Sequence, residues 1–403
     1  MTGLRGKTIV CVSTIDWDFL WQGHQEIMSR FARDGNRVIF VENIGGIRSV
    51  RASDTRRLLK RLGRSLRTGG MRPSGVDHEL LVITPILLPF PGSRIARFVN
   101  HALIKRLARR VHTESGRDPI LFTFLPTEEA LELLAHLRGP NSVSVYYCVA
   151  DFRALAQDPG AVRKSEEELV RSSDLVFVNS PRYAERLKGL HPTILQFPGG
   201  VNLQRFSPAR TARATELDAL PRPLIGYIGG LHQHLDLELL RKIARAMPDA
   251  SIVLVGPILA DVSPLRAERN VHLLGAREPD ALPSLIAAFD VGLIPYVLSG
   301  YTETVYPNKL FEYLAMGRPV VATDLPEIRA LQLPELAMRV AKDHEQFIAG
   351  VRAAVADSAA SATRARIELA RQHDWDAIVQ RMGTLIADAA LAKMGDPNQA
   401  DPQ

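Results

Sequence analysis

Residues 305–323 read VYPNKLFEYLAMGRPVVAT and combine several signals of one local structure. Pro307 precedes a helical pattern that starts at Lys309, Gly317 ends the pattern, and the apolar residues that follow predict a buried strand. A helix N-terminus presents unpaired N–H groups, and Lys309 adds a positive charge beside it. The stretch therefore predicts a diphosphate site, with Glu312 accepting hydrogen bonds from ribose hydroxyls. The simpler interpretation of Lys309 and Glu312 is a surface pair on one helix.

The rest of the chain alternates strand and helix patterns around this stretch. We predict strands at residues 8–12, 37–41, 80–84, 120–124, 143–149, 175–179, 193–197, 224–228, 251–255, 271–274, 291–294 and 320–322, and helices at 22–33, 235–246, 279–289, 309–316 and 376–391. Such alternation is typical of parallel, doubly wound sheets. The predicted fold class is α/β: two Rossmann-like domains that face a central cleft, where the carboxyl ends of the strands bind ligands.

The second run of strands follows a proline-rich stretch of little periodicity, so we place the domain boundary there. The predicted division is an N-terminal domain at 1–204, a linker at 205–222 and a C-terminal domain at 223–372. A helix at 373–392 is expected to return to the first domain, and residues 393–403 to form a flexible tail.

The composition is that of an ordinary globular chain: 403 residues, 46% hydrophobic and 23% charged. Two cysteines, Cys11 and Cys148, are too few for a disulfide framework or a zinc cluster. The start of the chain carries no signal-peptide pattern, and the apolar run at 80–90 is too short to span a bilayer. We therefore expect a cytoplasmic protein.

Positive charge is concentrated in one segment. The chain has a formal net charge of +6, but residues 48–112 alone carry 15 Lys/Arg against three acidic residues, a net +12. Residues 56–67 and 94–110 both have the pattern of basic amphipathic helices, which can lie on an anionic bilayer. The alternatives are an ordinary solvated helix face and nucleic-acid binding, which ranks last because the basic stretches hold a single aromatic residue.

Three stretches resemble the donor domain of GT-B glycosyltransferases: residues 225–240 (IGYIGGLHQHLDLELL), 271–296 (VHLLGAREPDALPSLIAAFDVGLIPY) and 305–323. The last has the family's Pro-x-Lys-apolar-apolar-Glu followed by Gly-x-Pro-Val-Val. The resemblance covers nearly the whole chain and implies that 1–204 is an acceptor domain and 223–372 a donor domain. It implies a nucleotide-sugar donor bound by eight residues: Gly229, Gly230, Ala276, Arg277, Tyr296, Asn308, Lys309 and Glu312. The alternative for Ala276, Arg277 and Tyr296 is that they bind no ligand and lie on a loop surface or at the edge of the core.

One departure from the family pattern bears on whether the transfer retains or inverts the configuration of the sugar. Many retaining members carry an additional Glu eight residues before the ribose-binding Glu, and this sequence has Thr304 there, with Glu303 beside it. An inverting transfer is therefore slightly favoured, and it needs a general base. Asp151, which follows the predicted strand 143–149, is our first choice, and capping of the following turn is its alternative. His24 is the second candidate base, and a structural role is its alternative.

Residues after the first strand are expected to bind the acceptor: Asp16, Trp17, Trp21 and Gln25. The resemblance implies a glycosyltransferase of cell-surface polysaccharide or glycolipid assembly, with a UDP-sugar as the favoured donor and a glycan or lipid-linked hydroxyl as acceptor. We expect no metal, no other cofactor, no nucleic acid and peripheral contact with an anionic membrane at the inner face. The alternatives are a non-hydrolysing sugar-nucleotide epimerase of the same fold and a catalytically silent membrane scaffold.

Overall fold

A computed structural model describes residues 3–18, 21–44, 71, 79–88, 94–300, 302–357 and 359–395. The chain divides into two compact units: Met1–Pro198 with Asp376–Gln403, and Gly199–Trp375. The division falls at residue 198 rather than after residue 204, and the expected linker 205–222 lies within the second unit. The predicted basic helix at 56–67 lies outside the described residues.

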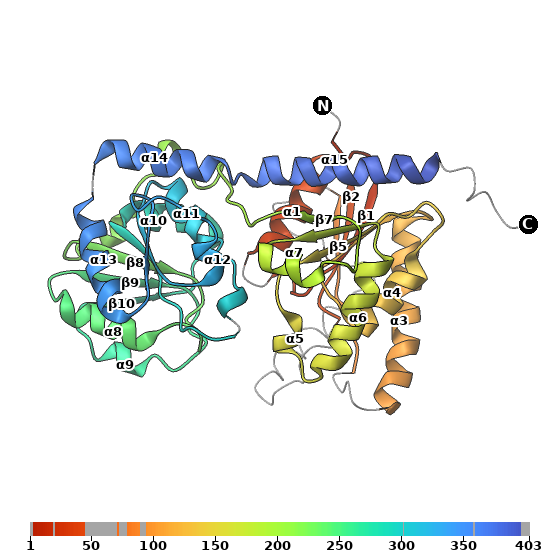
Figure 1. Cartoon of the computed structure of the whole chain (residues 1–403), viewed down its shortest axis with the longest axis horizontal. Coiled ribbons are helices and arrows are strands. Elements are labelled where there is room, and N and C mark those ends of the chain that lie inside the picture. Colours follow the sequence, from red (N-terminus) through yellow and green to blue (C-terminus); the bar gives the residue numbers. More distant parts are fainter. Residues whose placement is uncertain are drawn as a thin grey trace, which may run out of the picture. The chain divides into compact units, whose positions relative to one another are not determined.

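The first unit is built on a seven-stranded parallel sheet with the strand order β3-β2-β1-β4-β5-β6-β7 (Figure 1). Its strands are β1 Thr8–Val12, β2 Arg37–Val41, β3 Leu80–Ile83, β4 Ile120–Thr123, β5 Ser144–Cys148, β6 Leu175–Val178 and β7 Ile194–Gln196. Its helices are α1 Gly23–Arg33, α3 Arg94–Ser115, α4 Glu128–Leu137, α5 Phe152–Leu155, α6 Pro159–Ser172 and α7 Pro181–Leu187. The strands are continuous apolar runs because helices cover both faces of a parallel sheet.

The last helix, α15 Trp375–Met394, is held to the first unit by ion pairs and packing. Asp376 contacts Arg30 and Arg33 of α1 at 2.5 and 2.9 Å, and Lys393 contacts Asp174 at 2.9 Å. The close approach of Gly383 to Phe31 adds an apolar contact. Figure 1 shows α15 (blue) running beside α1.

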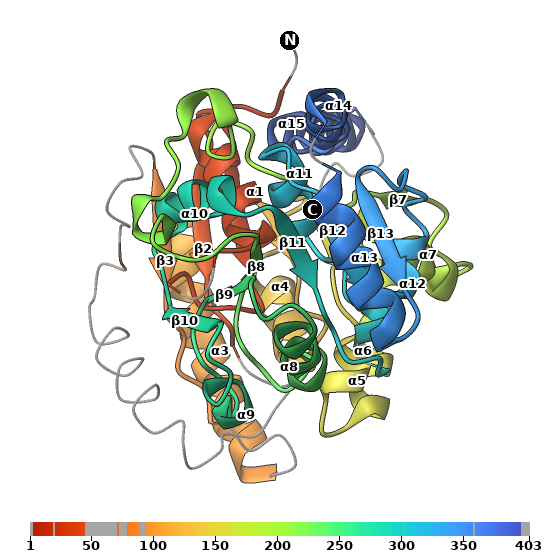
Figure 2. The same cartoon turned by 90° about the vertical axis from the view of Figure 1, so that its left-hand side faces the viewer.

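The second unit repeats the plan with a six-stranded parallel sheet, in the order β10-β9-β8-β11-β12-β13. Its strands are β8 Leu224–Ile228, β9 Ser251–Val255, β10 Val271–Gly275, β11 Val291–Ile294, β12 Val320–Thr323 and β13 Met338–Ala341. Its α-helices are α8 Leu237–Ala246, α9 Ser263–Arg266, α10 Leu282–Ala288, α11 Lys309–Ala315, α12 Pro326–Arg329, α13 His344–Ala356 and α14 Ala360–Arg371. Short 3₁₀ helices are η2 Pro208–Arg210, η3 Thr215–Leu217, η4 Pro279–Ala281 and η5 Thr302–Thr304. Helices α8 and α13 pack against each other (Figure 2), and α11 packs against α14.

The second unit holds helices α9, α12, α13 and α14 that the sequence prediction did not bound, and two further differences have a clear physical cause. The expected helix 279–289 is divided into η4 and α10, because Pro283 lacks an N–H and is tolerated only in the first turn of a helix. The edge strand β13 was not predicted, because its exposed side breaks the apolar run that marks the other strands. Both differences leave the doubly wound α/β class intact, and it is confirmed.

In both sheets all strands are parallel, and the order in which they are added changes side between the first and fourth strands, at β1/β4 and at β8/β11. In open α/β sheets this switch point is where loops part and ligands bind. Gly229 follows β8, and Lys309 begins α11, the helix after β11. Among the described helices none combines the length and apolar character needed to cross a bilayer.

Candidate functional site

A cluster of aromatic hydroxyls surrounds Lys309 at the switch point of the second unit. Its Nζ donates hydrogen bonds to the hydroxyls of Tyr296 at 2.5 Å and Tyr227 at 3.5 Å. The same ammonium lies 4.8 and 4.9 Å from the centroids of the Tyr227 and Tyr296 rings. We call Tyr227, Gly229, His232, Tyr296 and Lys309 the Lys309 cluster.

Two tyrosine hydroxyls are hydrogen-bonded to the ammonium of Lys309. Burial lowers its pKa, but the interactions with Tyr227 and Tyr296 outweigh burial and hold the pKa above its ordinary value. Among the described residues no carboxylate forms an ion pair with Lys309. The ammonium therefore stays protonated and keeps its positive charge for an anion.

Glycines bring backbone close to this ammonium. Gly229 has φ +135°, and a Cβ there would lie 3.0 Å from Lys309 Nζ and 2.9 Å from the Tyr227 hydroxyl. Gly256, which follows β9, has φ +148°, and a Cβ there would lie 1.9 Å from the carbonyl oxygen of Gly229. Only glycine fits at either position, and the resulting turn leaves room for a phosphate to approach the backbone.

Backbone hydrogen bonds fix the loops that carry the cluster. Leu231 accepts from Leu259 at 2.9 Å and donates to Pro257 at 2.9 Å, which ties the loop after β8 to the loop after β9. Asp236 N–H donates to Pro295 at 2.8 Å, and Leu235 forms an antiparallel bridge with Tyr296. The Lys309 cluster is thus preorganised before any ligand binds.

His232 completes the cluster as a neutral side chain. Its ring centroid lies 6.1 Å from that of Tyr296. Burial, the charge of Lys309 and His234 together lower the pKa of His232 to about 4. His232 therefore adds hydrogen-bonding capacity without a second positive charge near neutral pH.

The other residues predicted on the donor side occupy three places. Asn308 precedes α11, which has seven residues, and its side chain forms no capping hydrogen bond. Glu312 lies partly exposed in the first turn of α11. Ala276 and Arg277 are exposed after β10, and Arg277 contacts Glu216 at 3.2 Å. The carbonyl of Gly230 accepts a hydrogen bond from the Tyr227 hydroxyl at 3.1 Å.

Asp151, the predicted base, caps a short helix in the first unit. It precedes α5 and accepts a hydrogen bond from the N–H of Arg153 at 3.2 Å. Its carboxylate also lies 3.5 Å from Arg153 Nε and 3.6 Å from an Nη of Arg186. Arg186 in turn pairs with the buried Glu166 at 2.8 Å. The turn-capping alternative is thus present in the structure, and the carboxylate, 24% exposed, still reaches solvent.

His24, the second candidate base, is enclosed at the switch point of the first unit. It is 5% exposed, its Nε2 lies 2.9 Å from Thr14 Oγ1, and its ring centroid lies 4.0 Å from that of Phe124. Burial lowers the pKa of His24 to about 3. A histidine with so low a pKa is a weak base near neutral pH, which favours the structural alternative.

The residues predicted to bind the acceptor contact one another, α1 and β2. Trp17 is 6% exposed, stacks edge-on against Phe40 at 5.0 Å and accepts at its carbonyl from Gln25 Nε2 at 3.1 Å. Trp21 donates its indole N–H to Glu26 at 2.6 Å. Asp16 is 3% exposed. These contacts hold Trp17 to Gln25 and Phe40, and Trp21 to Glu26.

Sequence reasoning missed four residues beside the predicted ones: Gly199, Tyr227, His232 and Gly256. Tyr227 and Gly256 stand at the ends of buried strands, the position that carries ligand-binding side chains in this fold class. Gly199 lies against Asn308, since a Cβ there would overlap the Asn308 side chain. The sequence signal for it was the paired glycines at 199–200.

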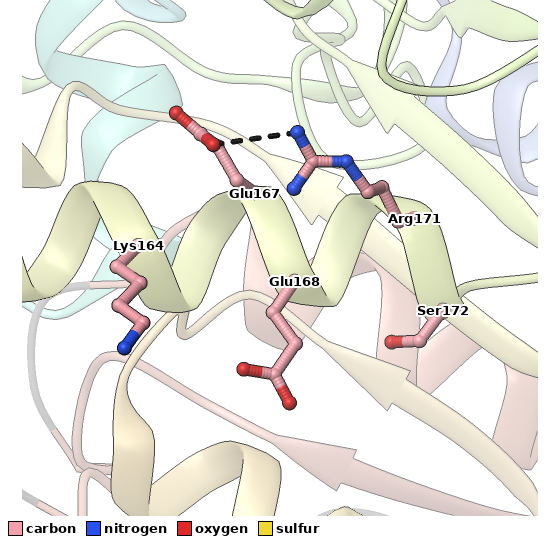
Figure 3. Close-up of a pocket in the computed structure, with 5 residues that line it drawn as sticks. All are labelled: Lys164, Glu167, Glu168, Arg171 and Ser172. Carbon is pink, nitrogen blue, oxygen red and sulfur yellow. Dashed lines mark hydrogen bonds and ion pairs between the residues drawn. The ribbon is translucent and has the colours of Figure 1, made fainter.

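A shallow hollow on α6 does not extend this site. Figure 3 shows its lining side chains, Lys164, Glu167, Glu168, Arg171 and Ser172, along one exposed helix face. Glu167 and Arg171 pair with each other at 3.4 Å. In the described part of the chain, no three His, Cys, Asp or Glu side chains gather as metal ligands would.

Comparisons with known proteins find similarity to glycosyltransferases. Residues 222–357 match the family described as Glycosyl transferases group 1. The chain is 28% identical over 232 residues to the putative teichuronic acid biosynthesis glycosyltransferase TuaH of Bacillus subtilis (strain 168). That match spans 55% of this chain and 58% of the relative's length.

Solved structures match over nearly the whole chain. Sucrose-phosphate synthase from Thermosynechococcus elongatus has a TM-score of 0.68 at 16% identity, covering 96% of this chain and all of that one. Anabaena HepE in complex with UDP and glucose has a TM-score of 0.66 at 14% identity, covering 95% of this chain and all of that one. The chain therefore has the GT-B fold of glycosyltransferases, and its residues 222–357 match the group 1 family.

Proposed function

We propose that this chain is a glycosyltransferase that takes a sugar from a nucleoside diphosphate sugar, with a UDP-sugar as the favoured donor. The observation that carries the proposal is Lys309, an ammonium held by two neutral hydroxyls beside a glycine turn. Such a group stabilises the diphosphate as it leaves, because the negative charge that develops there meets a positioned cation. The UDP and glucose complex of the similar HepE supports the donor class.

The remaining donor contacts follow from the positions around Lys309. Gly229 and Gly230 offer backbone to the diphosphate, and Tyr296 holds the ammonium in place. Glu312 is proposed to accept from the ribose hydroxyls, and Asn308 to contact the donor before α11. Ala276 and Arg277, exposed after β10, are proposed to border the nucleobase. No metal or other cofactor is proposed, because Lys309 supplies the charge that a divalent cation would otherwise provide.

For the acceptor we propose a hydroxyl of a glycan or lipid-linked intermediate in cell-surface polysaccharide or glycolipid assembly. The similarity to a putative teichuronic acid glycosyltransferase and the basic segment 48–112 support this class. We further propose that the protein acts in the cytoplasm, in peripheral contact with an anionic membrane.

We propose an inverting transfer with Asp151 as the general base. Asp151 is 24% exposed at the end of β5, whereas His24 is 5% exposed, so Asp151 is the group that an acceptor hydroxyl can reach. Asp16, Trp17, Trp21 and Gln25 are then proposed to shape the acceptor loop through the contacts that they make with one another and with α1.

The test is a thermal-shift screen against UDP, GDP, ADP and dTDP without metal, followed by product analysis with the matching sugar nucleotide. Ligand that binds the folded state raises the melting temperature. We expect a shift with UDP that Lys309→Ala abolishes and that Lys242→Ala, an exposed lysine on α8, retains. No shift with any nucleotide would overturn the proposal. Epimerised donor without an acceptor product would identify a sugar-nucleotide epimerase instead.

A further inference from the structure

The two most exposed large apolar side chains among the described residues lie in one turn of α3. Ile95 is 77% exposed and Phe98 is 79% exposed. Ile86 and Leu88, both 37% exposed, come from the segment just before this helix. Exposed apolar side chains that gather in one place mark an interaction site more often than scattered ones do.

Hydrogen bonds tie these two segments together. Asn100 accepts from the N–H of Leu88 at 2.7 Å and donates to the Leu88 carbonyl at 3.1 Å. Ala96 and Asn100 are buried, so Ile95 and Phe98 lie on the outer side of the helix. We call Ile86, Leu88, Ile95 and Phe98 the apolar tip.

Positive charge surrounds the apolar tip. Arg94 and Arg97 are exposed in the same turn, and neither pairs with a carboxylate of the described residues. The first turn of α3 holds no acidic residue. Positive charge at a helix N-terminus opposes the helix dipole, so these arginines are unfavourable for the helix unless an anion lies beside them.

The basic character continues along the exposed face of α3. Lys105, Arg106 and Arg109 are exposed further along the helix. Its one carboxylate, Glu114, lies in the last turn and pairs with Arg37 of β2. Exposed apolar side chains beside arginines that pair with no described carboxylate, on a helix whose exposed charges are mostly positive, are the chemistry that fits an anionic lipid surface.

We propose that the apolar tip is the site where this protein docks on an anionic lipid bilayer. Ile95 and Phe98 enter the boundary between headgroups and acyl chains, and Arg94 and Arg97 contact lipid phosphates. The inference deepens the membrane contact and rests on the proposed function, because that function places the acceptor at the membrane. A bilayer fits better than nucleic acid, since Phe98 is the one aromatic residue of α3.

The test uses the full chain and sedimentation with vesicles of phosphatidylcholine, with and without phosphatidylglycerol. We expect binding only where phosphatidylglycerol is present, and weaker binding at high salt because screening weakens attraction to the surface. Ile95→Asp with Phe98→Asp should reduce vesicle binding at least about tenfold, and so should Arg94→Glu with Arg97→Glu.

Matched controls separate this site from general surface effects. Leu391→Asp changes an apolar residue of α15 that is 63% exposed, and Arg163→Glu with Lys164→Glu reverses charge on exposed α6. Both should bind vesicles as the unchanged protein does. Phe98→Trp should show a fluorescence blue shift with anionic vesicles and none with phosphatidylcholine alone.

Three outcomes would overturn the docking site: no binding to anionic vesicles, equal loss in the control variants, or loss of self-association in the Ile95→Asp, Phe98→Asp variant. The last is measured by light scattering and would assign the tip to contact between copies of the chain. The UDP thermal shift is measured on the same samples. If that shift persists while vesicle binding fails, the docking site is wrong and the donor proposal stands.

Discussion

The two sheets each place a charged side chain beyond the carboxyl end of a strand, but they surround it differently. In the second unit, Lys309 is held by the neutral hydroxyls of Tyr227 and Tyr296. In the first unit, Asp151 lies between the guanidinium groups of Arg153 and Arg186. The charge of Lys309 is thus left for a ligand, whereas the charge of Asp151 is largely balanced within its own unit.

If the chain is the transferase that we propose, this difference predicts that the donor site is complete before substrates bind. A diphosphate at Lys309 would meet no described carboxylate that competes for the ammonium, whose hydrogen-bond partners are the Tyr227 and Tyr296 hydroxyls. An acceptor hydroxyl at Asp151 must share the carboxylate with two arginines and a backbone N–H. We therefore expect donor binding to depend on few residues. The basicity of Asp151 should depend on its neighbours as well.

The largest expected effect comes from Asp151→Asn. Asparagine caps helices about as well as aspartate, so the fold should be retained while the base is removed. We expect kcat to fall by about 10²–10⁴-fold, the range typical of general base catalysis. The measurement is steady-state turnover of the UDP-sugar together with UDP affinity, which should stay unchanged.

The control for Asp151 is Asp158→Asn, since Asp158 caps α6 in the same way and has no proposed chemistry. Turnover by Asp151→Asn within about threefold of the unchanged protein would mean that the carboxylate only caps α5. The first unit would then supply no base at this strand end, and the two sheet edges would differ in function as well as in charge.

A second effect tests the neutral state of His24. Its folded pKa, about 3, lies below the unfolded value near 6.5, so the unfolded state binds more protons between these values. Stability is therefore unaffected above pH 6.5 and falls as the pH drops below it. From pH 7.5 to pH 5 the loss should be about 2 kcal/mol.

Urea unfolding followed by tryptophan fluorescence measures this loss, because Trp17 and Trp21 both lie in the first unit. His24→Gln should reduce the acid-dependent loss, and His112→Gln on the exposed face of α3 should not. An unchanged slope in His24→Gln would show that His24 is protonated in the folded protein. His24 would then return as a candidate for proton transfer.

The smallest effect concerns the hydroxyls around Lys309. Tyr296→Phe keeps the ring but removes the hydroxyl 2.5 Å from the ammonium, and should weaken UDP binding about fivefold, or about 1 kcal/mol. Tyr227→Phe should have less effect, because its hydroxyl is 3.5 Å away. Calorimetric titration with UDP measures both. Equal affinity in all three proteins would show that the hydroxyls do not position Lys309.

The sequence was most informative where several local signals agreed. Strands 8–12, 37–41, 224–228, 251–255 and 291–294 have the predicted bounds, because continuous apolar runs between turns leave little choice. The proximity of Gly229, Tyr296 and Lys309 followed from the strand order of a doubly wound sheet. The roles proposed for these residues stay predictions.

The sequence could not predict which hydrogen-bond and ion-pair partners each side chain has. The arginines beside Asp151 come from α5 and α7, and Arg186 lies 35 residues further along the chain, so no spacing rule connects them. The sequence suggests Trp17 and Gln25 as acceptor-binding residues, but the Gln25 amide bonds the backbone of Trp17 and Gln22. These contacts depend on tertiary packing, which a pattern along the sequence does not predict.

The central claim is that Lys309 carries the donor site, and calorimetric titration with UDP without metal tests it most directly. The proteins are the unchanged chain, Lys309→Ala and Lys242→Ala. Loss of a charge-assisted contact worth about 2–3 kcal/mol should weaken UDP binding about 30–150-fold in Lys309→Ala, and Lys242→Ala should bind normally. Equal UDP affinity in all three proteins would contradict the account.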